Sequence, residues 1–316
     1  MRKALVVGIN DYPTAPLNEC VNDASKVAEL LETNGNASPN FDVRIEKNVQ
    51  TKSELKKMIV ELFSGSNTVA LLYFSGHGYI NELGGYLVTP DHKEYDEGIS
   101  MDEILKLANN SNDKDKIIIF DCCHSGAFGS PSIAQGSAYL KEGISILTSS
   151  KSSEPSVEIE GEGSLFTNLL LGALNGGAAD LRGHISPGGI YAYIDQALSS
   201  WKQRPVFKTN VTRFTSLREV EPQVPTDVLR KVIDYFPTPT QEYSLDPSYE
   251  DTNTDIQPYA KKENIAIFKN LQKLQSVGLV VPVDSPYMYF AAMESKSCKL
   301  TSLGHHYWRL AKNKRI

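Results

Sequence analysis

Cysteine is scarce in this chain, and long apolar runs and an excess of one charge are missing. Its 316 residues include four cysteines, too few for a disulfide scaffold, so we expect a reducing, cytoplasmic setting. No apolar run approaches the roughly 20 residues that span a bilayer, and we expect no membrane partner. The net charge of −6 gives no overall bias toward nucleic acid.

Short apolar runs alternate with helical patterns over residues 1–218. The start, residues 1–8, is basic and then apolar, but its apolar part is too short for a signal-peptide core, so we interpret residues 3–9 as a first strand. Further buried strands are expected at 41–45, 69–75, 116–121, 144–148 and 205–211, with helices between them. This alternation predicts an α/β fold with a mostly parallel sheet and helices on both faces.

The composition changes after residue 218. Residues 219–258 hold nine acidic residues, two basic residues and six prolines, whereas residues 261–316 hold ten basic and three acidic residues. We therefore predict a larger domain over 1–218, an acidic Pro-rich linker over 219–260 and a small basic domain over 261–316. Within the linker, residues 227–236 could form one helix.

The basic domain has the pattern helix, hairpin, helix. A helical pattern over 261–276 is followed by β-like runs at 279–283 and 287–291, and then by a final helix. This order resembles a winged-helix module. Three roles are open: a protein adaptor, an intramolecular lid, or DNA binding through basic side chains of the last helix and tail, namely Arg309, Lys312, Lys314 and Arg315. We expect a regulatory protein partner rather than DNA.

Two of the predicted strands run directly into residues with reactive side chains. The strand at 69–75 precedes His77, and the strand at 116–121 precedes Cys122 and Cys123, 46 residues after the histidine. The carboxyl ends of strands are where open α/β sheets place their chemistry. A histidine near a cysteine lowers the pKa of the thiol and protonates the leaving amine. The backbone N–H groups of Gly78 and Cys123 could form an oxyanion hole.

These residues resemble a known family. Residues 75–78, Ser-Gly-His-Gly, and residues 121–126, Asp-Cys-Cys-His-Ser-Gly, look like the His and Cys motifs of caspase-like peptidases, closest to the bacterial metacaspase branch. The match continues at 8–12, 17–24 and 163–167 and covers about residues 1–218. In the family the nucleophile directly precedes His-Ser-Gly, which implies Cys123 rather than Cys122, and His124 would orient the loop.

The resemblance also implies a specificity. Metacaspases bind Arg or Lys through two acids, which correspond here to Asp23 and Asp121. The alternative is that Asp23 caps a local turn and Asp121 braces the cysteine loop. Under Arg or Lys specificity, Lys141 and Lys151 are candidate self-cleavage sites, or else ordinary solvated lysines.

Many metacaspases also need calcium. The acids available for it here are Asp91 and Asp102, but Met101 stands where the family has another acid. Calcium needs several oxygen ligands, so we expect no metal and no other cofactor.

The function implied is a cysteine endopeptidase that cleaves after Arg or Lys, as a regulated effector of a bacterial defence or cell-death pathway. The alternative is a catalytically silent caspase-fold scaffold or DNA-binding regulator that acts through its C-terminal module. The remaining cysteines, Cys20 and Cys298, and the other histidines, His92, His184, His305 and His306, are expected to be structural or ordinary polar residues.

Overall fold

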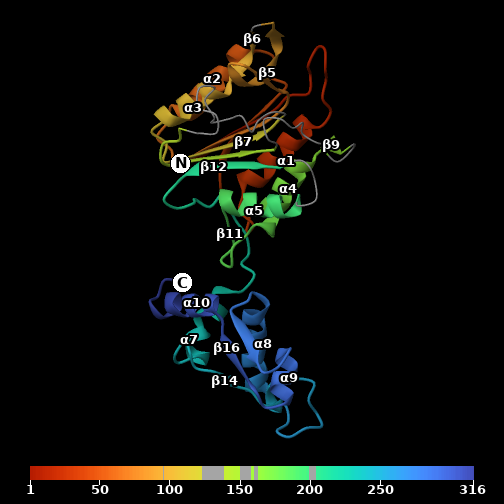
Figure 1. Cartoon of the computed structure of the whole chain (residues 1–316), viewed down its shortest axis with the longest axis vertical. Coiled ribbons are helices and arrows are strands. Elements are labelled where there is room, and N and C mark those ends of the chain that lie inside the picture. The colour runs from red at the N-terminus through yellow and green to blue at the C-terminus, as the bar shows by residue number, and fades with distance from the viewer. Residues whose placement is uncertain (95, 123–138, 150–157, 160–162, 199–203) are drawn as a thin grey trace. The chain divides into compact units, whose positions relative to one another are not determined.

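The chain folds into two compact units, residues 1–221 and residues 222–316 (Figure 1). The structure is a computed structural model that describes residues 1–94, 96–122, 139–149, 158–159, 163–198 and 204–316. Among these residues, no helix combines the length and the apolar character that a membrane crossing requires.

A six-stranded sheet forms the centre of the first unit, with the order β12-β8-β7-β3-β1-β2. Its strands are β1 (Arg2–Gly8), β2 (Asp42–Lys47), β3 (Val69–Ser75), β7 (Asp115–Asp121), β8 (Ile144–Thr148) and β12 (Val206–Asn210). Neighbouring strands pair in parallel except β12, which is antiparallel to β8. The predicted α/β class with a mostly parallel sheet is therefore confirmed.

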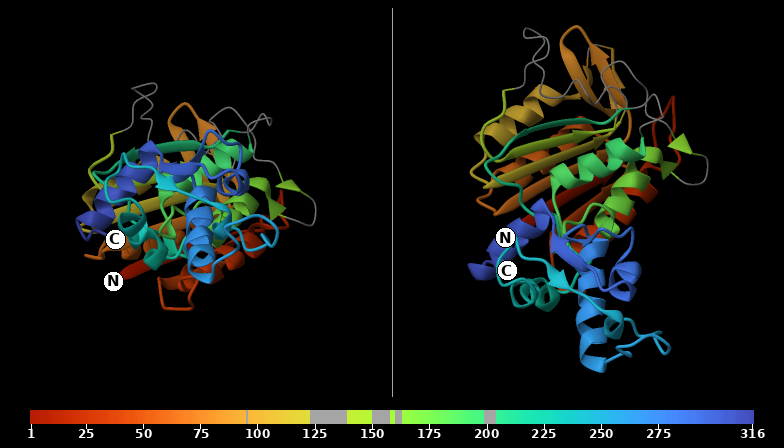
Figure 2. Two further views of the ribbon diagram at one scale, coloured as in Figure 1. Left: turned by 90° about the horizontal axis from the view of Figure 1, so that it is seen from below. Right: turned by 60° about the horizontal axis from the view of Figure 1, so that its bottom comes forward.

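Helices cover both faces of this sheet. One face carries α2 (Lys52–Phe63) and α3 (Met101–Asn110). The other carries α1 (Cys20–Glu32), α4 (Leu165–Gly172) and α5 (Pro187–Ala197). Figure 2 shows the same two layers from other directions. Each helix turns an apolar stripe toward the strands, which is why the helical spacing could be recognised in the sequence.

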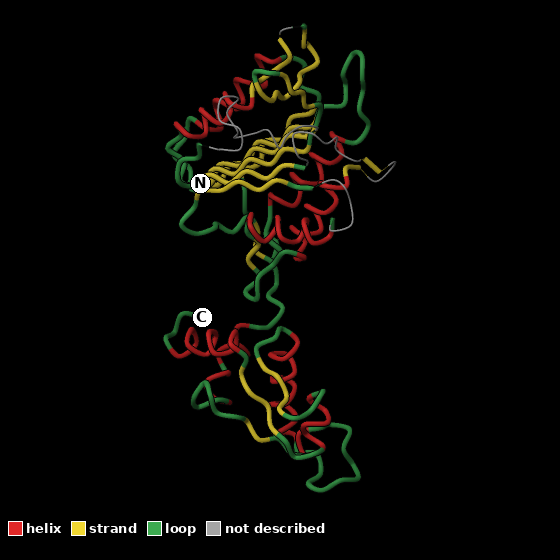
Figure 3. The backbone as a smooth tube through the Cα atoms, in the orientation of Figure 1, coloured by secondary structure: helices red, strands yellow, loops and turns green. Residues whose placement is uncertain are grey.

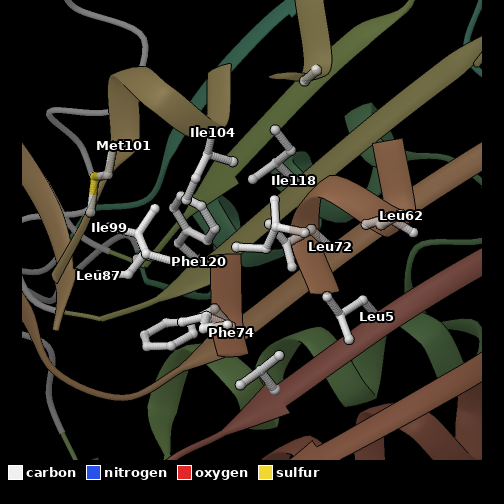
Figure 4. Close-up of a cluster of buried hydrophobic side chains, with 14 of the residues drawn as sticks. Leu5, Leu62, Leu72, Phe74, Leu87, Ile99, Met101, Ile104, Ile118 and Phe120 are labelled. Carbon is white, nitrogen blue, oxygen red and sulfur yellow. The ribbon is translucent and has the colours of Figure 1, made fainter. Parts of the chain in front are cut away.

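The strands are apolar on both faces because both faces are covered. Successive side chains of a strand point to opposite sides, so Leu72 packs under α2 and α3 whereas Leu71 packs under α1 and α4. Figure 4 shows the first of these clusters, in which Phe74 and Phe120 of neighbouring strands lie beneath Ile104 of α3. Their rings meet edge to face with centroids 6.5 Å apart.

The beginnings of α2 and α3 differ. Thr51 and Glu54 form a complete capping box at the start of α2. At the start of α3, Ser100 and Glu103 have the spacing of a capping box, but Ser100 makes no side-chain cap hydrogen bond. The Glu103 carboxylate lies instead 2.7 Å from the ammonium group of Lys56 and joins α3 to α2.

A three-stranded antiparallel sheet follows β3 in the chain. It consists of β4 (Gly78–Asn81), β5 (Gly84–Lys93) and β6 (Asp96–Ser100). The smaller elements of the unit are β9 (Glu158–Ile159), β10 (Gly163–Ser164), the π-helix η2 (Ala173–Gly177), β11 (His184–Ile185) and β13 (Arg218–Glu219). Buried Arg218 donates to the carbonyl groups of Thr33 and Leu174, and so fixes the end of the unit to its helical layer.

The second unit contains a three-stranded antiparallel sheet, β14-β16-β15, packed with helices (Figure 3). Its strands are β14 (Tyr243–Ser244), β15 (Val280–Val283) and β16 (Ser297–Leu300). Its helices are α6 (Thr226–Arg230), α7 (Val232–Tyr235), the 3₁₀-helix η3 (Pro247–Tyr249), α8 (Lys262–Ser276), α9 (Met288–Met293) and α10 (Ser302–Lys312).

The predicted linker is wrong, because residues 222–260 belong to this second unit. Trp308 of α10 donates from its indole N–H to the carbonyl of Phe236 at 2.6 Å, and β14 pairs with β16. The same acidic, Pro-rich segment also contains apolar side chains that are buried in the unit, such as Val228 and Phe236. The single helix predicted over 227–236 is divided into α6 and α7 on either side of Lys231.

The second predicted strand of the hairpin, residues 287–291, is also wrong. These residues enter helix α9, and the strand that pairs with β15 is β16. Met288, Ala291 and Ala292 are buried at positions i, i+3 and i+4, which is helical spacing. The aromatic residues between them, Tyr289 and Phe290, are of a type that is frequent in strands, but here they are exposed on a helix.

Candidate active site

The two predicted reactive segments leave the sheet at the same edge. Strands β3 and β7 are parallel neighbours, and Ser75 lies opposite Asp121 in their register. His77 follows Ser75 by two positions, as Cys123 follows Asp121. Cys123 and His124 lie outside the described residues, so the structure shows the histidine half of the site.

The imidazole of His77 is held by a main-chain carbonyl. Its Nε2 lies 2.7 Å from the carbonyl oxygen of Ala15, in the loop after β1. Because a carbonyl oxygen can only accept, Nε2 carries the proton and donates it. Neutral His77 therefore has an unprotonated Nδ1, which can act as a base. Sequence reasoning missed Ala15, because a carbonyl is common to every residue and has no sequence signal.

Tyr12 fixes the other side of the histidine. The two rings are tilted at 60° with centroids 4.5 Å apart. The Tyr12 hydroxyl accepts from the backbone N–H of His77 at 3.0 Å and donates to the carbonyl of Val88 at 3.2 Å. Burial raises the pKa of Tyr12 well above its usual range, so the hydroxyl stays protonated and can make both bonds.

Only a glycine at position 76 leaves room for Tyr12 to contact His77. A Cβ at position 76 would lie 2.6 Å from the Tyr12 hydroxyl oxygen and 2.9 Å from Cζ of Phe74. Tyr12 belongs to the matched segment 8–12, but the sequence offered no role for it. The structure thus adds Tyr12 and Gly76 to the residues that position His77.

The N–H group of Gly78 points away from the neighbouring strand. Gly78 lies opposite Leu87 in the β4–β5 ladder, and the N–H of Val88 bonds to the carbonyl of His77 at 3.0 Å. This makes Gly78 and Leu87 a non-hydrogen-bonded pair, whose N–H groups face outward. The second predicted donor, the N–H of Cys123, lies outside the described residues.

Asp23 and Asp121 are both buried, with exposures of 1% and 4%. Asp23 on α1 accepts from the backbone N–H of Ser164 at 3.0 Å, and its Oδ1 has no hydrogen-bond partner among the described residues. Asp121 at the end of β7 accepts from the Thr167 hydroxyl at 2.6 Å. The Thr167 hydrogen goes to the carboxylate, so Tyr73, 2.7 Å away, donates to Thr167.

Burial raises the pKa of Asp23 to about 7. The N–H of Ser164 opposes this rise, and the nearby charge of Asp121 adds to it. The structure thus brings the two predicted acids into electrostatic contact. The alternative for Asp23, a cap for a local turn, is wrong: its hydrogen bond goes to Ser164, 141 residues along the chain.

The remaining thiols are buried in apolar surroundings. Cys122 is 1% exposed and belongs to the core cluster under α2 and α3, with its carbonyl accepting from the Ser149 hydroxyl. Cys20 packs on α1. Burial raises the pKa of Cys298 to about 12, which keeps this thiol protonated.

The other described histidines lie outside the His77 contacts given above. His92 Nδ1 lies 3.0 Å from the carbonyl of Thr89. His184 lies 3.6 Å from Asp180 and 3.9 Å from Glu219, and His305 and His306 are on α10 of the second unit.

Lys141 lies at the opposite edge of the sheet from His77. The buried ammonium group of Lys116, near the start of β7, donates to the carbonyl of Glu142 at 3.1 Å. Asp121 is at the other end of the same strand, which is about 20 Å long at roughly 3.3 Å per residue. The N–H of Lys141 is also bonded to the Asn109 side chain at 2.8 Å. Lys151, the other candidate, lies outside the described residues.

The candidate calcium ligands have other roles. The Asp91 carboxylate accepts from the N–H of Lys52 at the start of α2 and from the Thr89 hydroxyl, so it complements the helix dipole. Asp102 lies in the first turn of α3. Within the described ranges, no three His, Cys, Asp or Glu residues converge as metal ligands. Asp91 and Asp102 therefore do not fit a calcium site, which takes about six to eight oxygens.

Comparisons with known proteins agree with this geometry. A family model described as the caspase domain matches residues 1–215. The crystal structure of caspase-1 from Spodoptera frugiperda is similar with a TM-score of 0.51 and 15% identity, over 69% of this chain and 90% of that chain. At this identity the likeness concerns the fold. A search of curated proteins found no match. Because the family model covers well over half of the sequence, the chain belongs to the caspase-domain family of cysteine peptidases.

Proposed function

We propose that the protein is a cysteine endopeptidase that cleaves after Arg or Lys, with His77 and Cys123 as its catalytic dyad. The observation that carries this proposal is the fixed imidazole: Ala15 holds Nε2, and Tyr12 packs against the ring. A base oriented in this way at the strand edge next to β7 is the arrangement that a thiol nucleophile needs.

The reaction follows from the tautomer of His77. Nδ1 takes the thiol proton of Cys123, and the thiolate sulfur bonds to the carbonyl carbon of the substrate. The tetrahedral intermediate collapses as Nδ1 gives that proton to the leaving nitrogen, the C–N bond breaks, and a thioester and a free amine result. Water then attacks the thioester while Nδ1 takes one of its protons, which returns to the sulfur as the acid leaves.

Of the two N–H groups that would stabilise the oxyanion, that of Gly78 lies among the residues the structure describes. It faces away from β5 and directly follows the catalytic histidine. Main-chain donors that are fixed before the reaction stabilise the charge of the tetrahedral intermediate without reorganisation.

The acid pair supports the preference for a basic side chain. Two buried carboxylates close together are unfavourable: burial is the main cause of the raised pKa of Asp23, and the charge of Asp121 raises it further. A bound guanidinium would offset both charges and give Asp23 Oδ1 a hydrogen-bond donor. Gly163 lies against this oxygen with φ of +94°, and a Cβ there would approach it to 2.5 Å. Glycine therefore keeps the space beside Asp23 open.

The test uses peptides that differ only in the residue before the scissile bond. We expect cleavage after Arg and Lys, no cleavage after Asp, and loss of all cleavage in Cys123→Ala. Preference for Asp would overturn the specificity. A Cys123→Ala protein with full biological function would instead support the alternative of a silent scaffold.

We further propose that the protein acts in the cytoplasm as a regulated effector of a bacterial defence pathway, with a regulatory protein bound at residues 261–316. The support is an exposed aromatic group around α9, formed by Tyr287, Tyr289 and Phe290, since such residues are frequent in protein interfaces. Changing Tyr287 and Tyr289 to Ser should preserve peptide cleavage and abolish the response to the cellular trigger. An unchanged response would contradict this binding site.

A further inference from the structure

A cavity of about 400 Å³ lies directly against His77. One wall comes from the loop after β1 and the other from the sheet β4–β5–β6. Its lining includes Tyr12, Thr14, Ala15, Tyr79 and Val88. The two residues that position the catalytic imidazole, Tyr12 and Ala15, are therefore also wall residues of this cavity.

The cavity lies on the side of His77 away from β7. In the sheet, β3 stands between β7 and β1, and the loop after β1 forms one cavity wall. The segment with the nucleophile follows β7, on the other side of β3. Since the histidine passes the thiol proton to the leaving nitrogen, that nitrogen lies on the histidine side of the attacked carbon. The residue that carries the leaving amine therefore extends toward the cavity.

The walls of the cavity are suited to an apolar side chain. Tyr12 and Val88 are 4% and 8% exposed and form a fixed apolar surface, while Tyr79 is 44% exposed and offers an aromatic face. Of the charged lining residues, Lys93 and Glu94 are exposed, whereas Glu97 is half-buried and its carboxylate accepts from the Asn81 side chain. An aromatic or large aliphatic side chain would lose apolar area to these walls, about 25 cal/mol per Å² removed from water, whereas a glycine would leave them hydrated.

We propose that this cavity binds the side chain that directly follows the scissile bond and selects a large aromatic or aliphatic residue there. The proposal rests on the proposed peptidase function and narrows its substrates to sites in which Arg or Lys precedes such a residue. Tyr79 and Thr14 then determine specificity at the leaving side of the bond.

The test uses two fluorogenic peptides that carry Arg before the bond and differ only in Phe or Gly after it. We expect the Phe peptide to have a kcat/KM at least tenfold higher in the wild-type protein. Tyr79→Ala should reduce this ratio at least threefold, because it removes the aromatic wall. Thr14→Trp should reduce the ratio to about one or below by filling the cavity from an exposed position.

Tyr139→Ala provides the matched control. Tyr139 is also an exposed tyrosine, at 70%, and it lies close to Lys141 at the far edge of the sheet, so the ratio should not change. Equal cleavage of both peptides by the wild-type protein, or an unchanged ratio in both cavity variants, would overturn the assignment of the cavity and leave the peptidase intact. Cleavage of neither peptide would overturn the peptidase function and this proposal with it.

Discussion

Nε2 of His77 and the carbonyl oxygen of Ala15 are 2.7 Å apart, so a backbone group orients the imidazole that we propose as the catalytic base. The bond fixes the tautomer and leaves Nδ1 for proton transfer. It also makes the geometry of the site depend on the path of the loop after β1, which Tyr12 anchors to Val88 and to the backbone of His77. Substitutions that move this loop should therefore lower peptidase activity even though they alter neither His77 nor Cys123.

Gly76→Ala tests this dependence. The new methyl group would lie 2.6 Å from the Tyr12 hydroxyl oxygen, so Tyr12 must shift and the His77 ring loses its support. We expect kcat to fall at least tenfold with little change in KM, measured on an Arg peptide. Tyr12→Phe keeps the ring and removes only the hydroxyl bonds, so its kcat should fall less. A Gly76→Ala enzyme with wild-type kcat would contradict the positioning role of Tyr12.

Asp23 should make Arg recognition depend on pH. Its pKa is raised to about 7, chiefly by burial, and only the ionised carboxylate pairs with a guanidinium. The KM for an Arg peptide should therefore fall as the pH rises from 6 to 8. In Asp23→Asn this pH dependence of KM should disappear and cleavage should drop at least a hundredfold. A wild-type KM that is constant over this range would show that Asp23 does not bind the substrate.

Asp23 should also lower the stability of the substrate-free protein as the pH rises. The folded-state pKa of about 7 lies above the ordinary 3.8, so between these values the native state holds a proton that the unfolded state has lost. Stability then decreases from about pH 4 to pH 7 and levels off above. Thermal unfolding should show Asp23→Asn similar to wild type at pH 4 and more stable at pH 8, by on the order of 4 kcal/mol. A difference that is the same at both pH values would contradict the raised pKa.

The sequence predicted the sheet well because its central strands are apolar at nearly every position, and burial on both faces produces that pattern. His77 could be predicted as a candidate for a similar reason: a reactive side chain after a buried strand is a sequence signal. Ala15 was not found, because its contribution is a carbonyl. The second unit was misread where local composition and tertiary packing disagree, since Phe236 lies in an acidic, Pro-rich segment yet bonds to Trp308.

Thr167→Val should affect both stability and specificity. The Thr167 hydroxyl links buried Tyr73 to Asp121, and valine has nearly the same shape without the hydrogen bonds. Leaving the Tyr73 hydroxyl and the Asp121 carboxylate without this partner should cost about 2–4 kcal/mol in urea unfolding. The preference for Arg peptides should weaken as well, because Asp121 loses its orientation. Thr167→Ser, which keeps the hydroxyl, should behave nearly like the wild type. A Thr167→Val protein as stable as the wild type would show that these hydrogen bonds do not contribute to stability.

The second unit should fold without the peptidase domain, but only as residues 222–316. This fragment keeps β14 paired with β16 and the bond between Trp308 and Phe236. A fragment of residues 261–316 loses both and exposes the surface that Val228 and Phe236 cover. Circular dichroism should show a cooperative thermal transition for the longer fragment alone. Cooperative unfolding of the fragment 261–316 would instead show that residues 222–260 are a linker that this domain does not need for folding.

Self-cleavage at Lys141 should not occur within one molecule. Lys141 lies about a full strand length, roughly 20 Å, from the edge that carries His77. Its backbone is also tied down, since Asn109 bonds to the N–H of Lys141, Asn210 to the carbonyl of Leu140 and Lys116 to that of Glu142. A peptidase binds its substrate as an extended chain whose backbone groups are available, so these bonds would have to break first. We expect intact-mass analysis of the incubated protein to give the same fragments for Lys141→Ala as for the wild type. Cys123→Ala should give no fragments. A wild-type fragment that ends at Lys141 even at high dilution, where cleavage between molecules is slow, would require this edge of the sheet to open.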